Sequence, residues 1–123
     1  IAADNGGTMR DSQGRENGRG IWGKTAAWCD YSGVVDDRRI GMTLMCHPKN
    51  FRPSWMHARD YGFIAANPFG RKAFTGREPS RVVVAPGEKV RLRYGVLIHE
   101  GTLDDPPDLN SAYEEYLTLS QTD

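Results

Sequence analysis

The chain has 123 residues, a formal net charge of zero and an apolar fraction of 38%. This length is typical of one ordinary domain with a single core. No apolar run approaches the roughly 18 residues of a membrane-spanning helix, so a transmembrane span is excluded. Charged residues at 26% and aromatic residues at 10% are typical of a folded chain and exclude wholesale disorder.

Charge is unevenly distributed along the chain. Residues 1–37 carry four basic and six acidic groups, residues 38–93 carry twelve and three, and residues 94–123 carry none and seven. Proteins that bind nucleic acid more often have a net basic domain, so no nucleic-acid partner is expected. We expect instead that the acidic tail folds back on the basic middle and neutralises it.

The first part of the chain predicts a polar start followed by strands. Residues 1–20 are polar and Gly-rich without apolar periodicity, which indicates a loop or linker. Residues 21–31 and 39–47 are predicted strands around a turn at 33–37. This hairpin would place Cys29 opposite a residue near 41, away from Cys46, so two free buried thiols are expected.

The rest of the chain continues this pattern and ends in a helix. Strands are predicted over residues 55–60, 61–66, 81–85 and 90–98, the last with Val96 and Ile98 inward and His99 outward. Ser111 and Glu114 form a capping-box pattern for a helix over about 109–119, within an acidic segment 102–123. The class is therefore all-β, an antiparallel β-sandwich over residues 21–101 with a short C-terminal helix.

One formal motif is interpreted as a coincidence. Residues 18–25 match G-x-x-x-x-G-K-[ST], the phosphate-binding P-loop. That loop needs a buried strand before it and a helix after it, to direct backbone N–H groups at phosphate. The residues before it are too polar and those after it too few, so nucleotide binding is not expected.

The three histidines are candidates for proton transfer or metal binding. Histidine titrates near neutral pH and can act as an acid, a base or a ligand. No H-x-H, H-E-x-x-H or C-x-x-C spacing joins them, so a zinc site formed by His47, His57 and His99 is only a weak alternative, and no cofactor is predicted. A structural or surface role is an equal alternative for each of them.

The densest functional pattern lies around residue 57. A strand over residues 55–60 would turn Met56 and Ala58 inward and project Trp55, His57 and Arg59 together from the other face. An aromatic ring beside two polar groups suits a sugar, which has C–H groups on one side and hydroxyls at its edge. The alternative, that Trp55 packs in a second sheet and Arg59 pairs with an acid, is equally consistent.

Several runs resemble a bacterial family of unknown function that carries the label "methane oxygenase PmoA". The resemblance covers about residues 20–101. It is carried by the runs Trp22-Gly23-Lys24, Trp28-Cys29-Asp30-Tyr31-Ser32-Gly33, Gly41, His47-Pro48-x-Asn50, Trp55-x-His57-x-Arg59-Asp60-Tyr61-Gly62, Ala65-Ala66-Asn67-Pro68-Phe69-Gly70, Leu92-Arg93-Tyr94 and Leu97-Ile98-His99-Glu100-Gly101.

The resemblance implies a soluble β-sandwich, since the absence of an apolar span does not fit the membrane subunit from which the label comes. It also implies association with sugar oxidoreductases and other carbohydrate-degrading proteins, a periplasmic or secreted location, and more weakly a galactose-mutarotase-like supersandwich. Family members look longer than this chain, which begins at Ile1. A C-terminal half is therefore expected, with a partner chain or a missing N-terminal half covering its exposed sheet edges.

We expect a carbohydrate-binding or carbohydrate-modifying protein, of mutarotase, lyase or hydrolase type if it is an enzyme. A non-catalytic assembly module is the alternative, being half of a larger protein or a subunit of a complex. The expected partners are a saccharide or another small polar ligand and a partner chain, not a membrane. In the carbohydrate case His57 would be the acid or base with Asp60 or His47 as its partner, and substrate would contact the remaining residues of the pattern, Trp55, Arg59, Asn67 and Tyr61.

Overall fold

The computed structural model describes residues 7–101 and 106–122. Within them the order of elements is β1 (Thr8–Asp11), α1 (Asn17–Ile21), β2 (Trp28–Val35), β3 (Arg38–Cys46), β4 (Trp55–Arg59), β5 (Phe63–Asn67), α2 (Arg71–Thr75), β6 (Tyr94–Gly101) and α3 (Leu109–Leu119), which a 3₁₀ turn over Ser120–Thr122 follows.

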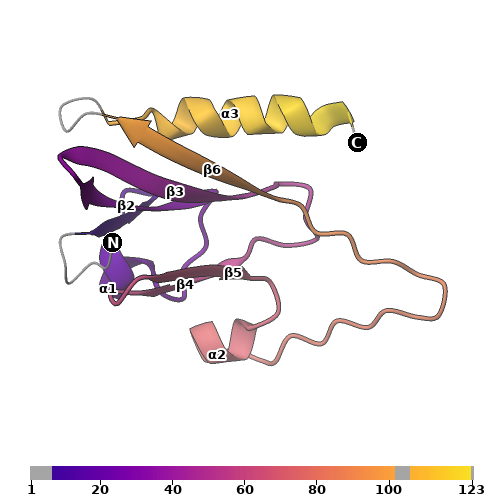
Figure 1. Cartoon of the computed structure of the whole chain (residues 1–123). Helices are drawn as coiled ribbons and strands as arrows, with labels where there is room; N and C mark the ends of the chain where they lie inside the picture. Colours follow the sequence, from indigo (N-terminus) through magenta and orange to yellow (C-terminus); the bar gives the residue numbers. More distant parts are fainter. Residues whose placement is uncertain (1–6, 102–105, 123) are drawn as a thin grey trace.

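The strands form two antiparallel sheets with α3 as a further layer (Figure 1). Sheet A has the order β1-β2-β3-β6, and sheet B is the hairpin β4-β5. Figure 1 shows α3 on one side of sheet A and sheet B with α2 on the other. The predicted all-β class with a short C-terminal helix is confirmed. No helix in the described part of the chain is long and apolar enough to cross a membrane.

The main core lies between the two sheets. Because strand side chains alternate between faces, every second residue of β2 and β4 points into this layer. Its fully or almost fully buried residues come from both sheets and from α1, and they are Met9, Ile21, Cys29, Cys46, Met56 and Ala58. Burial raises the pKa of the Cys29 thiol to about 12 and that of Cys46 to about 11, and both cysteines are free, as expected.

A second apolar cluster attaches α3 to the other face of sheet A. Trp28, Met45 and Leu109 are buried there, with Tyr113 and Tyr116 packed against them. The hydroxyl of Tyr113 also donates to the carbonyl of Cys46 at 2.7 Å. The N-cap of α3 is Asp108, whose carboxylate accepts from the backbone N–H and the hydroxyl of Ser111, so the predicted Ser111–Glu114 capping box is wrong. Helix α3 is therefore fixed by burial and capped by its own first turn.

The β2–β3 hairpin turns at Asp36 and Asp37, the last two residues of the predicted turn 33–37. Asp36 and Asp37 both have positive φ, 51° and 64°, which is the geometry of a two-residue type I′ turn. Asp adopts this left-handed conformation more readily than most residues. The shifted turn places Cys29 opposite Leu44 instead of a residue near 41.

The structure corrects three further predictions. Within the predicted loop 1–20, β1 pairs with β2 and α1 packs on β4, while residues 1–6 lie outside the described residues. The predicted strand 81–85 has no strand partner and belongs to an arm, residues 77–93, that extends from the body in Figure 1. In β6, Val96 and Ile98 lie on the predicted inner face but are 58% and 78% exposed, whereas the side chain of His99, predicted outward, is buried on the opposite face.

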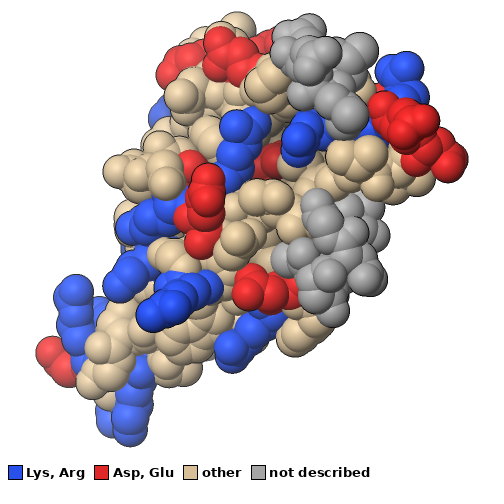
Figure 2. Space-filling model, turned by 90° about the vertical axis from the view of Figure 1, so that its left-hand side faces the viewer, with Lys and Arg blue, Asp and Glu red and all other residues tan. Residues whose placement is uncertain are grey.

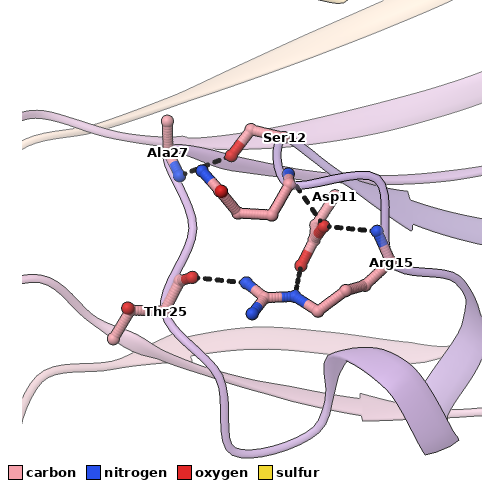
Figure 3. Close-up of polar contacts among 6 residues, drawn as sticks. Asp11, Ser12, Arg15, Thr25 and Ala27 are labelled. Carbon is pink, nitrogen blue, oxygen red and sulfur yellow. Dashed lines mark hydrogen bonds and ion pairs between the residues drawn. The ribbon is translucent and has the colours of Figure 1, made fainter.

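A buried carboxylate organises the segment between β1 and β2. Asp11 accepts from the backbone N–H groups of Gln13 and Arg15 at 3.0 Å and from Arg15 Nε at 2.7 Å (Figure 3). Arg15 also donates to the carbonyl of Thr25 at 2.6 Å, and Ser12 Oγ accepts from the N–H of Ala27. Figure 3 shows how these contacts tie the start of the segment to its end. The position of α1 follows from this network.

We predict that Asp11→Asn lowers the free energy of unfolding by about 2–3 kcal/mol, because an amide cannot serve as acceptor for all of these donors. Urea denaturation of both proteins measures the difference. Asp36→Asn is the matched control, since it makes the same change in an exposed turn, and it should stay within about 0.5 kcal/mol of the parent protein. Equal effects of the two substitutions would contradict the central role of Asp11.

Candidate functional site

The outer face of β4 carries the residues that the sequence singled out. Met56 and Ala58 are each 1% exposed and point into the core, so Trp55, His57 and Arg59 share the opposite face. Trp55 is half-buried, and residue 25 forms an isolated bridge with it along the outer edge of β4. The predicted arrangement of these three side chains is thus present in the structure.

His57 lies among aromatic rings that come from three other elements of the chain. Its ring centroid is 5.0 Å from that of Phe63, 5.8 Å from Phe74 and 6.2 Å from Trp22, all in edge-to-face geometry. Arg59 Nε donates to His57 Nε2 at 3.1 Å, so Nε2 acts as an acceptor and Nδ1 carries the proton. In this arrangement the lone pair of Nε2 is already used, and His57 holds the guanidinium of Arg59 in place.

Trp22 is the site residue that sequence reasoning missed. It follows α1, and the next residues run along β4: Gly23 N–H donates to the carbonyl of Met56, and Met56 N–H donates to that of Lys24. A Cβ at Gly23 would lie 2.9 Å from the carbonyl oxygen of Phe74, and its φ of 77° favours glycine. Trp22 and His57 are 35 residues apart in the sequence, so no local pattern indicated that their rings would meet.

Trp22 and Arg59 line a hollow of about 350 Å³. The guanidinium carbon of Arg59 lies 5.4 Å from the Trp22 ring centroid, within the range of a cation–π contact. Asp60 also lines the hollow, and its Oδ1 accepts from the N–H of Gly18 at 2.8 Å. Gly18 is required here because a Cβ would lie 2.9 Å from the carbonyl oxygen of Ala58. The hollow therefore combines one aromatic ring, two arginines (Arg19 and Arg59) and a carboxylate.

Figure 2 views the end of the molecule that faces left in Figure 1. Basic side chains gather in the lower part of this view, on the side of sheet B and α2, whereas acidic groups lie more towards the top, on the side of α3. Basic side chains also lie beside acidic ones in the upper part of this view, so the two charges are not separated on this face.

Two further predicted contact residues have local partners. Asn67 Oδ1 accepts from the N–H of Phe69 at 2.7 Å and closes the turn after β5. Tyr61 is 69% exposed, with its ring 6.5 Å from that of Phe63. Neither side chain lines the hollow beside Trp22.

His47 lies in a different environment, under α3. Its Nδ1 accepts from the N–H of Lys49 at 3.1 Å, so Nε2 carries the proton and donates to Ser120 Oγ at 2.9 Å. Burial, together with the charges of Arg93 and Lys49, lowers the pKa of His47. His47 also lines a separate hollow of about 310 Å³. It does not join His57 and Asp60, the two residues predicted to act with it.

The third histidine belongs to a buried polar cluster on the α3 side of sheet A. Asp30, 0% exposed, accepts on Oδ1 from Thr43 Oγ1 and pairs with His99 Nε2, both at 2.6 Å. Its Oδ2 is buried and has no hydrogen-bond partner among the residues described. Next to it Ser32 accepts from Arg39 at 3.4 Å. The sequence signal for this cluster was weak because its members lie on three separate strands.

Gly41 makes the contact between His99 and Asp30 possible. A Cβ on Gly41 would lie 2.5 Å from His99 Cε1 and 2.7 Å from Ser32 Cβ. The imidazole of β6 therefore crosses the backbone of β3 at Gly41 to reach the carboxylate on β2. Glycine is needed here for close approach, not for an unusual backbone conformation.

The weak metal alternative and the P-loop motif receive no support from this geometry. His47, His57 and His99 lie in three different environments, and the described part of the chain has no group of three His, Cys, Asp or Glu side chains suited to a metal. In the P-loop match, α1 occupies the beginning of the motif and the Gly18 N–H donates to Asp60. These backbone groups do not form a phosphate cradle.

Comparison with known proteins gives one match. Residues 1–114 match the family model described as "Family of unknown function (DUF6807)". No curated protein and no solved structure matches the chain.

We predict that protonation of His47 weakens the docking of α3. Because the pKa of His47 is lowered in the folded state, the unfolded chain binds the extra proton more readily. This stabilisation is therefore complete above the ordinary histidine pKa of about 6.5 and is lost as the pH falls below it. Urea denaturation between pH 7.5 and 5 should show the loss, and His47→Gln should flatten the curve. His57→Gln, which changes another histidine in the same way, is the control. A pH dependence of the unfolding free energy that is as steep in His47→Gln as in this control would contradict the prediction.

We also predict that Gly41→Ala lowers the free energy of unfolding by about 2–4 kcal/mol. The added methyl group displaces His99 and leaves a buried carboxylate short of a donor. Gly20→Ala is the matched control, because its Cβ would make only ordinary contacts at 3.5 Å, and it should change the unfolding free energy by at most about 0.5 kcal/mol. Denaturant titration measures the unfolding free energy of both variants. Equal values for Gly41→Ala and Gly20→Ala would show that His99 need not cross β3 at Gly41.

Proposed function

We propose that this chain, which belongs to the family of unknown function DUF6807, binds a saccharide in the hollow beside β4. The observation that carries this proposal is that Trp22, Arg59 and Asp60 line one hollow of about 350 Å³ although Trp22 comes from a distant part of the sequence. The expected resemblance to PmoA-labelled proteins and to galactose-mutarotase-like sandwiches points towards the same class of ligand.

The chemistry of these three side chains suits a sugar ring. An aromatic ring contacts the C–H groups of one sugar face, while polar groups beside it bind the hydroxyls at the edge. Arg59 is exposed and supplies donors, and Asp60 retains acceptor capacity on Oδ2 beside its bond to Gly18. A ligand with hydroxyl groups both donates and accepts, so it can satisfy the two residues together.

Trp22 offers a second reason to place a polar ligand here. Its indole N–H is buried and has no hydrogen-bond partner among the residues described. A buried donor without a partner costs free energy, commonly about 1–3 kcal/mol. A small displacement of the ring on binding would let a sugar hydroxyl accept from this group.

We assign His57 a positioning role in this proposal. Its Nε2 already accepts from Arg59, and three aromatic rings surround it. A general base needs a free lone pair within reach of the proton it removes. The geometry therefore favours binding over the acid–base chemistry that the sequence pattern also allowed.

The test is a titration of the protein with neutral and acidic monosaccharides and short oligosaccharides. Binding is monitored by tryptophan fluorescence and by the NMR signals of the indole N–H groups. We predict that Arg59→Ala weakens binding at least tenfold, about 1.4 kcal/mol, because it removes the guanidinium that contacts the Trp22 ring and supplies donors to the hollow. His57→Gln should weaken binding less, because Arg59 remains but is held less firmly.

Arg52→Ala is the matched control. Arg52 also lies over an aromatic ring, that of Phe51 at 4.9 Å, but it does not line this hollow. Its loss should leave binding unchanged. The proposal fails if none of the sugars shifts the Trp22 signal, or if the Arg59 and Arg52 variants bind equally well.

A further inference from the structure

Part of the inner face of sheet A is uncovered. Sheet B has two strands and sheet A has four, and the side chains of Met42, Val96 and Ile98 on β3 and β6 are 51%, 58% and 78% exposed. A hollow of about 570 Å³ runs between this face and β5, with Ile98, Met42 and Phe63 among its walls. Contiguous apolar surface of this kind usually marks an interaction site.

The outer edge of β6 is also unpaired among the described residues, because β6 ends the strand order of sheet A. The carbonyl of Arg93 accepts from His47 N–H, on the β3 side. Backbone groups alternate in direction along an antiparallel strand, so those of Tyr94, Val96 and Ile98 point away from β3. β6 contains no proline or lysine, which commonly protect such an edge from pairing with another chain.

The residues that lead into β6 are amphipathic and basic. Residues 89–93 read Lys-Val-Arg-Leu-Arg and form the returning limb of the extended arm. Lys89 and Arg91 are exposed, and Val90 is 43% exposed. Figure 1 shows this limb continuing the line of β6 away from the body. With a pairing partner it would lengthen β6, as the sequence pattern over 90–98 predicted.

We propose that this surface binds a second copy of the chain, through antiparallel pairing of residues 89–101 with the same residues of that copy. A two-fold axis at Gly95 places Tyr94 opposite Val96 of the second copy and Leu92 opposite Ile98 of the second copy. In this register the outward-pointing backbone groups of the even-numbered residues meet each other. The same patch serves both copies, as two-fold symmetry requires.

Both faces of the paired strands are complementary in this register. On the inner face, Leu92 and Tyr94 of one copy extend the apolar surface of Val96 and Ile98 of the other, and such cross-strand pairs stabilise a sheet. On the opposite face, this register places Lys89 and Arg91 across from Gly101 and His99 of the second copy, on the side of sheet A that carries α3. The acidic residues that the structure describes on that side are Asp108, Glu114 and Glu115, at the N-cap and within α3, and neither β6 nor α3 contains Lys or Arg. Charge complementarity therefore favours a second copy as the occupant.

This proposal is independent of the saccharide site on sheet B, and its tests measure mass and cross-linking instead of ligand binding. Sedimentation equilibrium of the purified chain should give twice 13.7 kDa. Ile98→Lys should shift the protein to the monomer, because it places charge on the apolar seam without affecting a buried contact. Val83→Lys is the matched control, since Val83 is 84% exposed on the other limb of the arm and should leave the dimer intact.

A disulfide test checks the register. Leu92→Cys with Ile98→Cys should give a covalent dimer on mild oxidation, because residue 92 of one copy lies opposite residue 98 of the other. Within one copy the two positions are six residues apart on an extended chain, about 20 Å, which is too far for a disulfide. Leu92→Cys with Val96→Cys is the register control and should not cross-link.

A monomer at the highest soluble concentration would overturn the proposal, and so would a dimer that Ile98→Lys leaves intact. Cross-linking in the control register would refute the two-fold axis at Gly95. Loss of the dimer in Lys89→Glu with Arg91→Glu, together with weaker association at high salt, would support the charge complementarity.

Discussion

The buried carboxylate of Asp11 is the contact on which the arrangement of the N-terminal part depends. Its hydrogen bonds to Gln13 and Arg15, and the bond from Arg15 to Thr25, close a loop that contains α1. This closed loop holds α1 against β4 and delivers Trp22 to the outer face of that strand. A polar contact beside the core thereby determines which aromatic residue joins the candidate site.

Sheet A separates two kinds of surface. Its inner face packs against sheet B over β1, β2 and part of β3, and this layer holds both thiols and the core residues of α1. Its other face carries α3 at one end and the buried Asp30–His99 pair at the other. The inner surface of β6 at Val96 and Ile98, together with Met42 of β3, is exposed, and the proposed contact with a second copy forms there.

How much could be predicted depended on whether the relevant contacts were local. Alternation along residues 55–59 correctly predicted which side chains of β4 point outward, because strand geometry alone decides it. The Val-rich segment 81–85 satisfied the same rule without forming a strand, because a strand also needs a pairing partner. Alternation could not predict that Trp22 meets His57, because the folded segment between β1 and β2 brings them together. It could not predict the Asp30–His99 pair either, because that contact depends on the missing side chain of Gly41.

Chemical modification of the two core thiols, Cys29 and Cys46, can measure how often the core opens. Because burial raises the pKa of Cys29 to about 12 and that of Cys46 to about 11, almost no thiolate exists at neutral pH while the sheets stay packed. An alkylating reagent can therefore modify them only when sheets A and B separate. The alkylation rate then measures how often this interface opens, without any introduced probe.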